Sequence, residues 1–282
     1  MILYRSMVEG DVPAGLDLCR AAGWNQTADD WELFLKLSPA GCRVAVDEDG
    51  KVRGTVATVR YEDHFSWIGM VLVDPSMQRQ GIGIQLLRES LQVLCEEGTV
   101  KLDATPAGRK VYVQLDFEDE YPISRMEIKK MSDKFGQVSA ARFTRDIDMP
   151  MLLEHDRQVF GANREKVLNS MLERSPQYAF VAEDKKGIKG YCFGRVGHHF
   201  SHIGPVIAQD LETAKNVAAA ALRNCAGSPV VIDVLQHSAE WLQWLSSIGF
   251  KEQRPLIRMY RGTNAYPGIP GNQFAVLGPE FG

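Results

Sequence analysis

The sequence of 282 residues lacks the features of several specialised protein classes. It has no basic excess, because 32 Lys and Arg residues face 36 Asp and Glu residues, whereas duplex-binding proteins usually carry a basic excess or stripe. No apolar run approaches the roughly 20 residues needed to span a bilayer. Its first residues, Met1-Ile-Leu-Tyr-Arg-Ser, lack the charged leader and apolar core of a signal peptide. These absences predict a cytoplasmic protein that binds neither nucleic acid nor membrane.

Recognisable metal and disulfide patterns are also absent. The cysteines, at positions 19, 42, 95, 192 and 225, include no Cys-x-x-Cys pair and no Cys/His cluster, which indicates neither a zinc site nor a disulfide framework. We expect them to be buried packing residues. His198, His199 and His202 are close in sequence, but neighbouring residues of a strand point to opposite faces. We therefore expect no metal.

What the sequence does contain is an internal repeat. Residues 64–72 read HFSWIGMVL and residues 199–207 read HFSHIGPVI, and turn signals at 48–54 and 183–190 precede the two copies. This period is too long for a solenoid and suits two copies of one domain. We predict an N-terminal domain over 1–132 and a C-terminal domain over 140–282, joined by a polar linker at 132–137.

Strand and helix patterns alternate in both copies. For the first copy we expect a strand at 2–6, helices near 11–22 and 28–37, strands near 43–46, 52–60 and 65–73, an amphipathic helix through 84–94, a strand near 100–104, a short helix near 107–115 and strands near 117–131. For the second we expect helices near 149–160, 163–173, 210–224 and 237–248. The predicted class is α/β (or α+β), with a mixed sheet in each domain.

One segment of the first copy carries a ligand-binding pattern. The strand Met70-Val-Leu-Val73 is followed by Asp74-Pro75, then by Gln78-Arg-Gln-Gly81-Ile-Gly83, and the helix starts directly afterwards. Two glycines let the backbone approach a ligand, and free N–H groups at a helix N-terminus attract an anion. Arg79 can add a charge-assisted bond to a phosphate oxygen. This loop predicts a pyrophosphate site, although a Gly-x-Gly before a helix can also be a plain turn.

The same segment resembles the acetyl-CoA loop of the GNAT superfamily of N-acetyltransferases. Further on, Tyr112-Val-Gln-Leu-Asp116-Phe117 is similar to the Tyr-x-x-x-Gly-Phe ending of that superfamily, with Asp116 where Gly is usual. Nearly the whole chain resembles the bacterial two-domain, YitH-like subgroup, through Phe160-Gly-Ala-Asn-Arg164, Ile203-Gly-Pro-Val206 and Gly278-Pro-Glu-Phe-Gly282. The resemblance implies two tandem GNAT domains, each with a mostly antiparallel sheet flanked by helices.

The resemblance also implies a set of cofactor contacts. The backbone of Val71, Leu72 and Val73 would pair with the pantetheine arm of acetyl-CoA as an added strand does. The pyrophosphate would be held by the loop residues, which are Gln78, Arg79, Gln80, Gly81, Ile82, Gly83 and Ile84. Tyr112 would lie near the thioester sulfur, unless it is an ordinary packing residue. The implied reaction is direct acetyl transfer to an amine, without a covalent acyl-enzyme.

The second copy has lost the loop. After Ala208 the chain runs Gln-Asp-Leu-Glu-Thr, with no glycine and two carboxylates, which suit a helix cap and would repel a pyrophosphate. We expect the C-terminal domain to shape the acceptor pocket or the domain interface and to do no chemistry itself.

The sequence does not identify a general base. Glu62, Asp63, His64 and Asp103 are available, but each is expected to be a solvated or structural group, and a water chain could serve instead. The leading interpretation is an acetyl-CoA-dependent N-acetyltransferase acting on a small amine, and the net charge of −4 favours a cationic acceptor. The alternative is a non-catalytic acyl-CoA-binding sensor or scaffold. Neither the acceptor nor the oligomeric state can be determined from the sequence.

Overall fold

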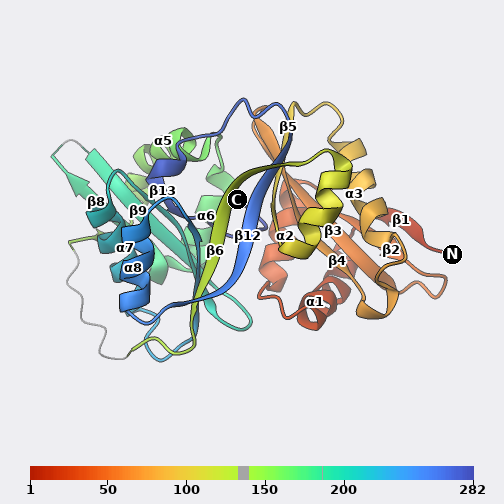
Figure 1. The fold of residues 1–282 in the computed structure, drawn as a ribbon, viewed down its shortest axis with the longest axis horizontal. Coiled ribbons are helices and arrows are strands. Elements are labelled where there is room, and N and C mark those ends of the chain that lie inside the picture. Colours follow the sequence, from red (N-terminus) through yellow and green to blue (C-terminus); the bar gives the residue numbers. More distant parts are fainter. Residues whose placement is uncertain (133–139, 186) are drawn as a thin grey trace.

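A single sheet of thirteen strands runs through the computed structural model of the chain (Figure 1). The structure describes residues 1–132, 140–185 and 187–282, so the predicted linker lies outside the described residues from position 133 onward. The strand order is β1-β2-β3-β4-β5-β12-β6-β11-β13-β10-β9-β8-β7. Most neighbouring strands are antiparallel, and the exceptions include the β4–β5 and β10–β11 pairs, which are parallel.

The first half of the chain forms the elements that its hydrophobic pattern predicts. They are β1 (Leu3–Ser6), α1 (Val12–Ala21), α2 (Ala28–Leu37), β2 (Arg43–Val46), β3 (Val52–Tyr61), β4 (Phe65–Val73), α3 (Ile82–Val93), β5 (Thr99–Ala104), α4 (Pro106–Tyr112) and β6 (Glu118–Ile128). The two strands expected near 117–131 are one long strand.

The second half repeats this order. It comprises β7 (Arg142–Phe143), α5 (Met149–Phe160), α6 (Glu165–Arg174), β8 (Phe180–Asp184), β9 (Gly187–Val196), β10 (Ser201–Ala208), α7 (Leu211–Arg223), β11 (Val230–Leu235), α8 (Ala239–Ser247), β12 (Lys251–Gly262) and β13 (Gln273–Ala275). The four helices expected here are confirmed, and α5 and α6 correspond to α1 and α2.

The two halves exchange a strand. β6 and β12 are equivalent, since each follows a Phe, at 117 or 250, that ends the preceding turn. β12 nevertheless pairs with β5 over Ile257–Gly262, while β6 pairs with β11 over Ile123–Ile128. The two long strands lie side by side at the centre of the molecule (Figure 1). Each half therefore completes its sheet with a strand from the other half.

The core is continuous between the halves. One apolar cluster includes Trp31 and Phe34 of α2 together with Leu168 of α6 and Phe193 of β9. Phe281, in the segment after β13, is fully buried and stacks on Phe34 at 4.4 Å between ring centroids. A separate cluster under α3 contains Leu86 and Ile68. Helices thus cover both faces of the sheet in the first half, with α1 and α2 opposite α3.

No helix within the described ranges is both long and apolar enough to cross a membrane. Four cysteines are buried as expected, but Cys95 is exposed, because it follows the last turn of α3 at the surface. The strand geometry expected for His198 and His199 is also wrong. They lie in the turn between β9 and β10, where His198 N donates to Asn25 O and His199 N donates to Asn25 Oδ1. In the part of the chain that the structure describes, no three His, Cys, Asp or Glu residues form a possible metal site.

Candidate active site

The site begins where two parallel strands separate. β4 and β5 pair only at Ser66–Val100 and Trp67–Lys101. The remainder of β4 has no ladder partner on that side among the residues that the structure describes. A register shift between β3 and β4, with Met70 at φ 56°, marks a β-bulge in β4. Bulges of this kind interrupt pairing and redirect side chains beside active sites. The edge of β4 from Gly69 to Val73 is consequently open toward a cavity.

The predicted phosphate loop leads into α3 with a left-handed residue. Gly81 is the N-cap residue at φ 84°, and an added Cβ there would meet no atom within 4 Å. Within the described part of the chain, no side chain caps this N-terminus. The first N–H groups of an α-helix have no intrahelical acceptor, so those of Ile82, Gly83 and Ile84 remain available. The geometry of this end of the cavity fits an anionic group.

Tyr112 is positioned by its own short helix. Thr105 caps α4 by accepting a bond from Gly108 N at 3.1 Å. The Tyr112 ring lies over Gly108, where an added Cβ would be 3.0 Å from a ring carbon. Burial raises the pKa of Tyr112 to about 12, so its phenol is a proton donor at neutral pH. Asp116, which stands where the resembling family has Gly, has φ 64°, and Asp is among the few non-glycine residues that tolerate this conformation.

A cavity of about 750 Å³ joins these parts to the second half of the chain. The lining residues near the loop and Tyr112 include Gly69, Met70, Val71, Val73, Gln78, Arg79, Gly81, Ile82, Gly83, Ile84, Asp103, Thr105 and Gly108. Its other wall includes Asn25, Arg125, Arg195, Phe200, His202, Arg254, Leu256, Pro279 and Glu280. Among the predicted cofactor residues, Leu72 and Gln80 do not line it, and the Leu72 side chain belongs to the core.

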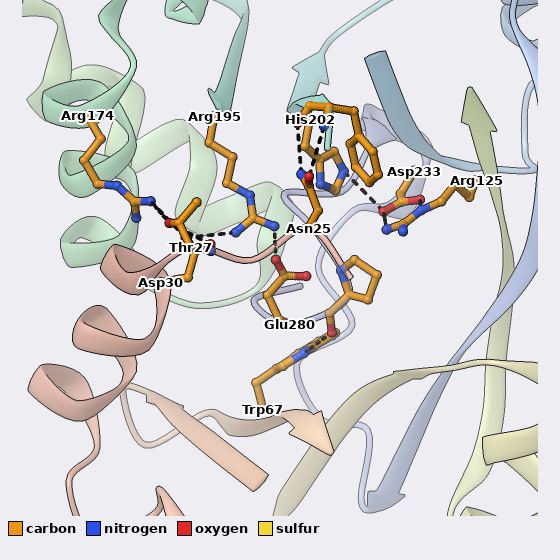
Figure 2. A network of polar contacts seen from close by, with 12 residues as sticks. Asn25, Thr27, Asp30, Trp67, Arg125, Arg174, Arg195, His202, Asp233 and Glu280 are labelled. Atoms are coloured by element: carbon orange, nitrogen blue, oxygen red, sulfur yellow. Dashed lines mark hydrogen bonds and ion pairs between the residues drawn. The ribbon is translucent and has the colours of Figure 1, made fainter. Parts of the chain in front are cut away.

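A network of buried charges forms the second wall (Figure 2). Asp30 of α2 contacts Arg174 Nη2 at 3.0 Å and Arg195 Nη1 at 3.2 Å. The other end of the Arg195 guanidinium pairs with Glu280. Trp67 Nε1 of β4 donates to Pro279 O at 3.0 Å. The segment that carries Pro279 and Glu280 is thereby held against the first half of the chain.

His202 and Asp233 form a buried pair beside this network. His202 Nε2 lies 3.2 Å from Asp233 Oδ2, and Arg125 donates two bonds of 2.7 Å to the same carboxylate. Burial opposes ionisation of Asp233, but Arg125 and His202 outweigh it and lower its pKa. Burial lowers the pKa of His202, against the opposing effect of Asp233. At neutral pH His202 is therefore an uncharged imidazole on the cavity wall, able to accept a proton.

The four acidic or histidine candidates for a base have structural partners or face solvent. Glu62 accepts bonds from Arg157 Nε at 3.1 Å and from Asn163 N at 2.8 Å. His64 stacks on Tyr266 and contacts Gly161 O at 2.8 Å. Asp63 is exposed. Asp103 lines the cavity, but both of its oxygens accept bonds from Arg258, at 2.8 and 2.9 Å.

Sequence reasoning missed the residues of the second wall. A usable signal was present, because Trp67 of the first repeat aligns with His202 of the second, where a polar ring replaces an aromatic one in a matching strand. Arg195, likewise, is a charge within the apolar strand β9. Neither residue could be connected to the loop from the sequence, since the exchange of β6 and β12 brings the two walls together.

In the second half, strand β13 occupies the position equivalent to the open edge of β4. β10 and β11 pair in parallel only at Ser201–Val230 and His202–Val231. Beyond that point β13 inserts between them, pairing Val206–Ala275 on one side and Val234–Ala275 on the other. The following helix, α7, is capped by Asp210, which accepts from Thr213 N at 2.7 Å, as expected from its acidic start.

Models of known protein families match both halves of the chain. Residues 16–117 match the model of the Acetyltransferase (GNAT) family, and residues 152–275 match a second model, Acetyltransferase (GNAT) domain. The chain is 22% identical over 278 residues to the uncharacterized N-acetyltransferase YitH of Bacillus subtilis (strain 168), covering 97% of this chain and 96% of that protein.

Solved structures share the fold over all or most of the chain. A putative acetyltransferase from Pyrococcus horikoshii superposes with a TM-score of 0.84 at 22% identity, over 100% of this chain and 96% of that one. A tandem GNAT protein from the clavulanic acid biosynthesis pathway superposes with a TM-score of 0.63 at 13% identity, over 92% of this chain and 98% of that one. The chain belongs to the GNAT acetyltransferases and contains two GNAT domains in tandem. It is an acyltransferase.

Proposed function

We propose that the chain transfers the acetyl group of acetyl-CoA directly to an amine of a small molecule bound between its two halves. The observation that carries this proposal is the cavity of about 750 Å³, which has the uncapped N-terminus of α3 at one end and buried polar side chains of the second half at the other. Acetyl-CoA supplies a thioester, whose carbonyl carbon the amine attacks. The cytoplasmic location predicted from the sequence belongs to this proposal too.

The residues of the first half bind the donor. The N–H groups of Ile82, Gly83 and Ile84 hold the pyrophosphate, with Arg79 beside them on the cavity wall. The open edge of β4 at Val71 and Val73 pairs with the pantetheine amides. As the C–S bond breaks, Tyr112 donates a hydrogen bond to the sulfur, where negative charge develops.

The second half positions and deprotonates the acceptor. His202 is neutral, and its Nε2 faces Asp233 across 3.2 Å, an arrangement that stabilises the imidazolium formed when the ring takes the amine proton. This role departs from the expectation that the second half does no chemistry. Both walls are needed, because the donor residues and His202 belong to different halves.

The test is release of free thiol from acetyl-CoA in the presence of a panel of small amines. We expect thiol release that depends on one or more amines, with a product heavier than the amine by one acetyl group. Intact-mass measurement of the enzyme incubated with acetyl-CoA alone should show no acetylated form. Binding of acetyl-CoA without amine-dependent thiol release would instead support the alternative of an acyl-CoA sensor or scaffold.

A further inference from the structure

Two arginines lie directly opposite each other on the cavity wall. Arg254 of β12 is the register partner of Arg125 of β6, and both line the cavity. Opposite residues of an antiparallel pair share a face of the sheet, where like charges are destabilising. A register shift between Glu252 and Arg254 interrupts the ladder just before this pair, as a bulge does when it redirects the side chains that follow. The fold therefore maintains an unfavourable pair of cations at this position.

Most charges around this pair are matched. Arg125 is paired with Asp233, Arg258 with Asp103, and Arg195 with Asp30 and Glu280. Arg254 differs, because within the described residues it forms no ion pair. Its buried Nε, like that of Arg195, has no hydrogen-bond partner among these residues. Burial, followed by the charge of Arg125, lowers the pKa of Arg254. The charge of Asp233 acts in the opposite direction, but Asp233 is already paired with Arg125. The wall thus carries one guanidinium group that has no ion-pair partner among the described side chains.

We infer that the acceptor is an amino carboxylate, whose carboxylate group binds Arg254 beside Arg125. A guanidinium group presents a planar fork of donors that matches a carboxylate. One unmatched positive charge suits a group of one negative charge better than a phosphate of nearly two. The inference rests on the proposed function, and it reverses the expectation of a cationic acceptor drawn from the net charge of the whole chain.

The buried network also limits the distance between the amine and the carboxylate of the acceptor. Asp233 Oδ2 accepts from Arg125 Nη2 at 2.7 Å and lies 3.2 Å from His202 Nε2. One carboxylate oxygen thus connects the arginine beside Arg254 to the proposed proton acceptor. An amine that reaches His202 while its carboxylate stays at Arg254 belongs to a compact molecule, which favours an amino acid over a long-chain amino carboxylate.

The experiment compares matched acceptors on matched variants. Each set of acceptors contains an amino acid, its amide, the amine formed from it by decarboxylation, and its aminophosphonate analogue. The variants are Arg254→Gln, Arg254→Lys and the control Lys251→Gln, which removes the same charge from an exposed residue of the same strand. We expect the wild type to prefer the amino acid. Arg254→Gln should raise the KM of the amino acid at least tenfold, or about 1.4 kcal/mol, without changing the KM of the decarboxylated amine.

Arg254→Lys should lie between the wild type and Arg254→Gln, and Lys251→Gln should match the wild type. The dissociation constant of acetyl-CoA should stay the same in all of these variants, which also shows that they are folded. Equal use of the amino acid and its decarboxylated amine, with no effect of Arg254→Gln, would overturn the inference. Preference for the aminophosphonate would overturn the assignment of a carboxylate.

A second readout separates this inference from the proposed function. Calorimetric titration of the CoA-bound protein with N-acetyl amino acids, and with the corresponding N-acetyl amines, measures product binding without turnover. The carboxylate site is supported, even if no amine is acetylated, when the N-acetyl amino acids bind more tightly than the N-acetyl amines and Arg254→Gln raises their dissociation constants at least tenfold. Thiol release with decarboxylated amines only, together with no preference in the titration, would leave the proposed function intact and refute the carboxylate site.

Discussion

Replacing Tyr112 with Phe tests how the leaving thiolate is stabilised. The change removes one hydroxyl and keeps the ring, whose contacts include Gly108 beneath it and Phe117 at 6.0 Å between centroids. The pKa of Tyr112 is about 12, and that of an ordinary thiol is about 8.5. Complete proton transfer to the thiolate would therefore be uphill by about 5 kcal/mol. The larger contribution should be a hydrogen bond to the developing charge.

A hydrogen bond to a charged group contributes about 1.5–3 kcal/mol, so kcat should fall by about 10- to 150-fold in Tyr112→Phe. The dissociation constant of acetyl-CoA should change little. Since the phenol stays protonated far above neutrality, the wild-type kcat should not decline near pH 10 through loss of this proton. The control is Tyr260→Phe, because Tyr260 is on β12 outside the cavity and its hydroxyl bonds to Glu118 at 3.1 Å.

Two results would refute this reasoning. A wild-type rate in Tyr112→Phe, measured with an accepted amine at saturating acetyl-CoA, would make Tyr112 a packing residue. A loss far beyond 10³-fold would mean that the hydroxyl transfers its proton, which requires a pKa in the complex much nearer to that of the thiol.

Four further predictions concern other parts of the molecule. Gly83→Val should weaken acetyl-CoA binding at least tenfold, or about 1.4 kcal/mol. The melting temperature should not change, because the added Cβ would meet only Val73 Cγ2, at 3.4 Å, among the described residues. An unchanged dissociation constant of acetyl-CoA would contradict the pyrophosphate site. Calorimetry should find one CoA per chain, since β13 fills the second gap, and two equivalent sites would disprove this. Phe281→Ala should lower the free energy of unfolding by about 3–5 kcal/mol in urea melts, whereas a loss below about 1 kcal/mol would show that this segment adds little to the core. The wild-type kcat should fall with acid only below the ordinary His pKa of about 6.5, because the pKa of His202 is lowered. His202→Gln should lose most of kcat. A wild-type pH profile of kcat in this variant would exclude His202 as the proton acceptor.

Much of the fold was accessible from the sequence because its signals are local. The β-branched and aromatic residues of 52–61 and 65–73 and the apolar spacing of Ile84, Leu87 and Leu91 need only neighbouring residues to be interpreted, and the structure has β3, β4 and α3 at these places. The loop was equally accessible, because glycine spacing between a strand and a helix defines its backbone. Its pyrophosphate role stays a prediction.

The strand exchange could not be predicted, and its cause lies in the repeat itself. β6 and β12 are equivalent strands, so β5 could pair with either of them on pattern alone. The exchanged arrangement brings together residues far apart in sequence, such as Asp103 with Arg258 and Asp233 with Arg125. These two pairs occupy matching positions in the two repeats, yet only an observed sheet order reveals them. The predicted division into 1–132 and 140–282 describes the repeat and stays a prediction about domains.

The same exchange explains why a second GNAT copy can serve a single site. Its own gap between β10 and β11 is occupied by β13, and the segment after β13 continues to Glu280, which lies against Gly69 of β4. One stretch of chain therefore closes the second gap and lines the first. Donor contacts then depend on the bulge of β4 and the start of α3, whereas acceptor contacts depend on β9, β10 and β12. Because different strands carry them, substitutions at Arg254 should change acceptor preference while leaving acetyl-CoA affinity intact.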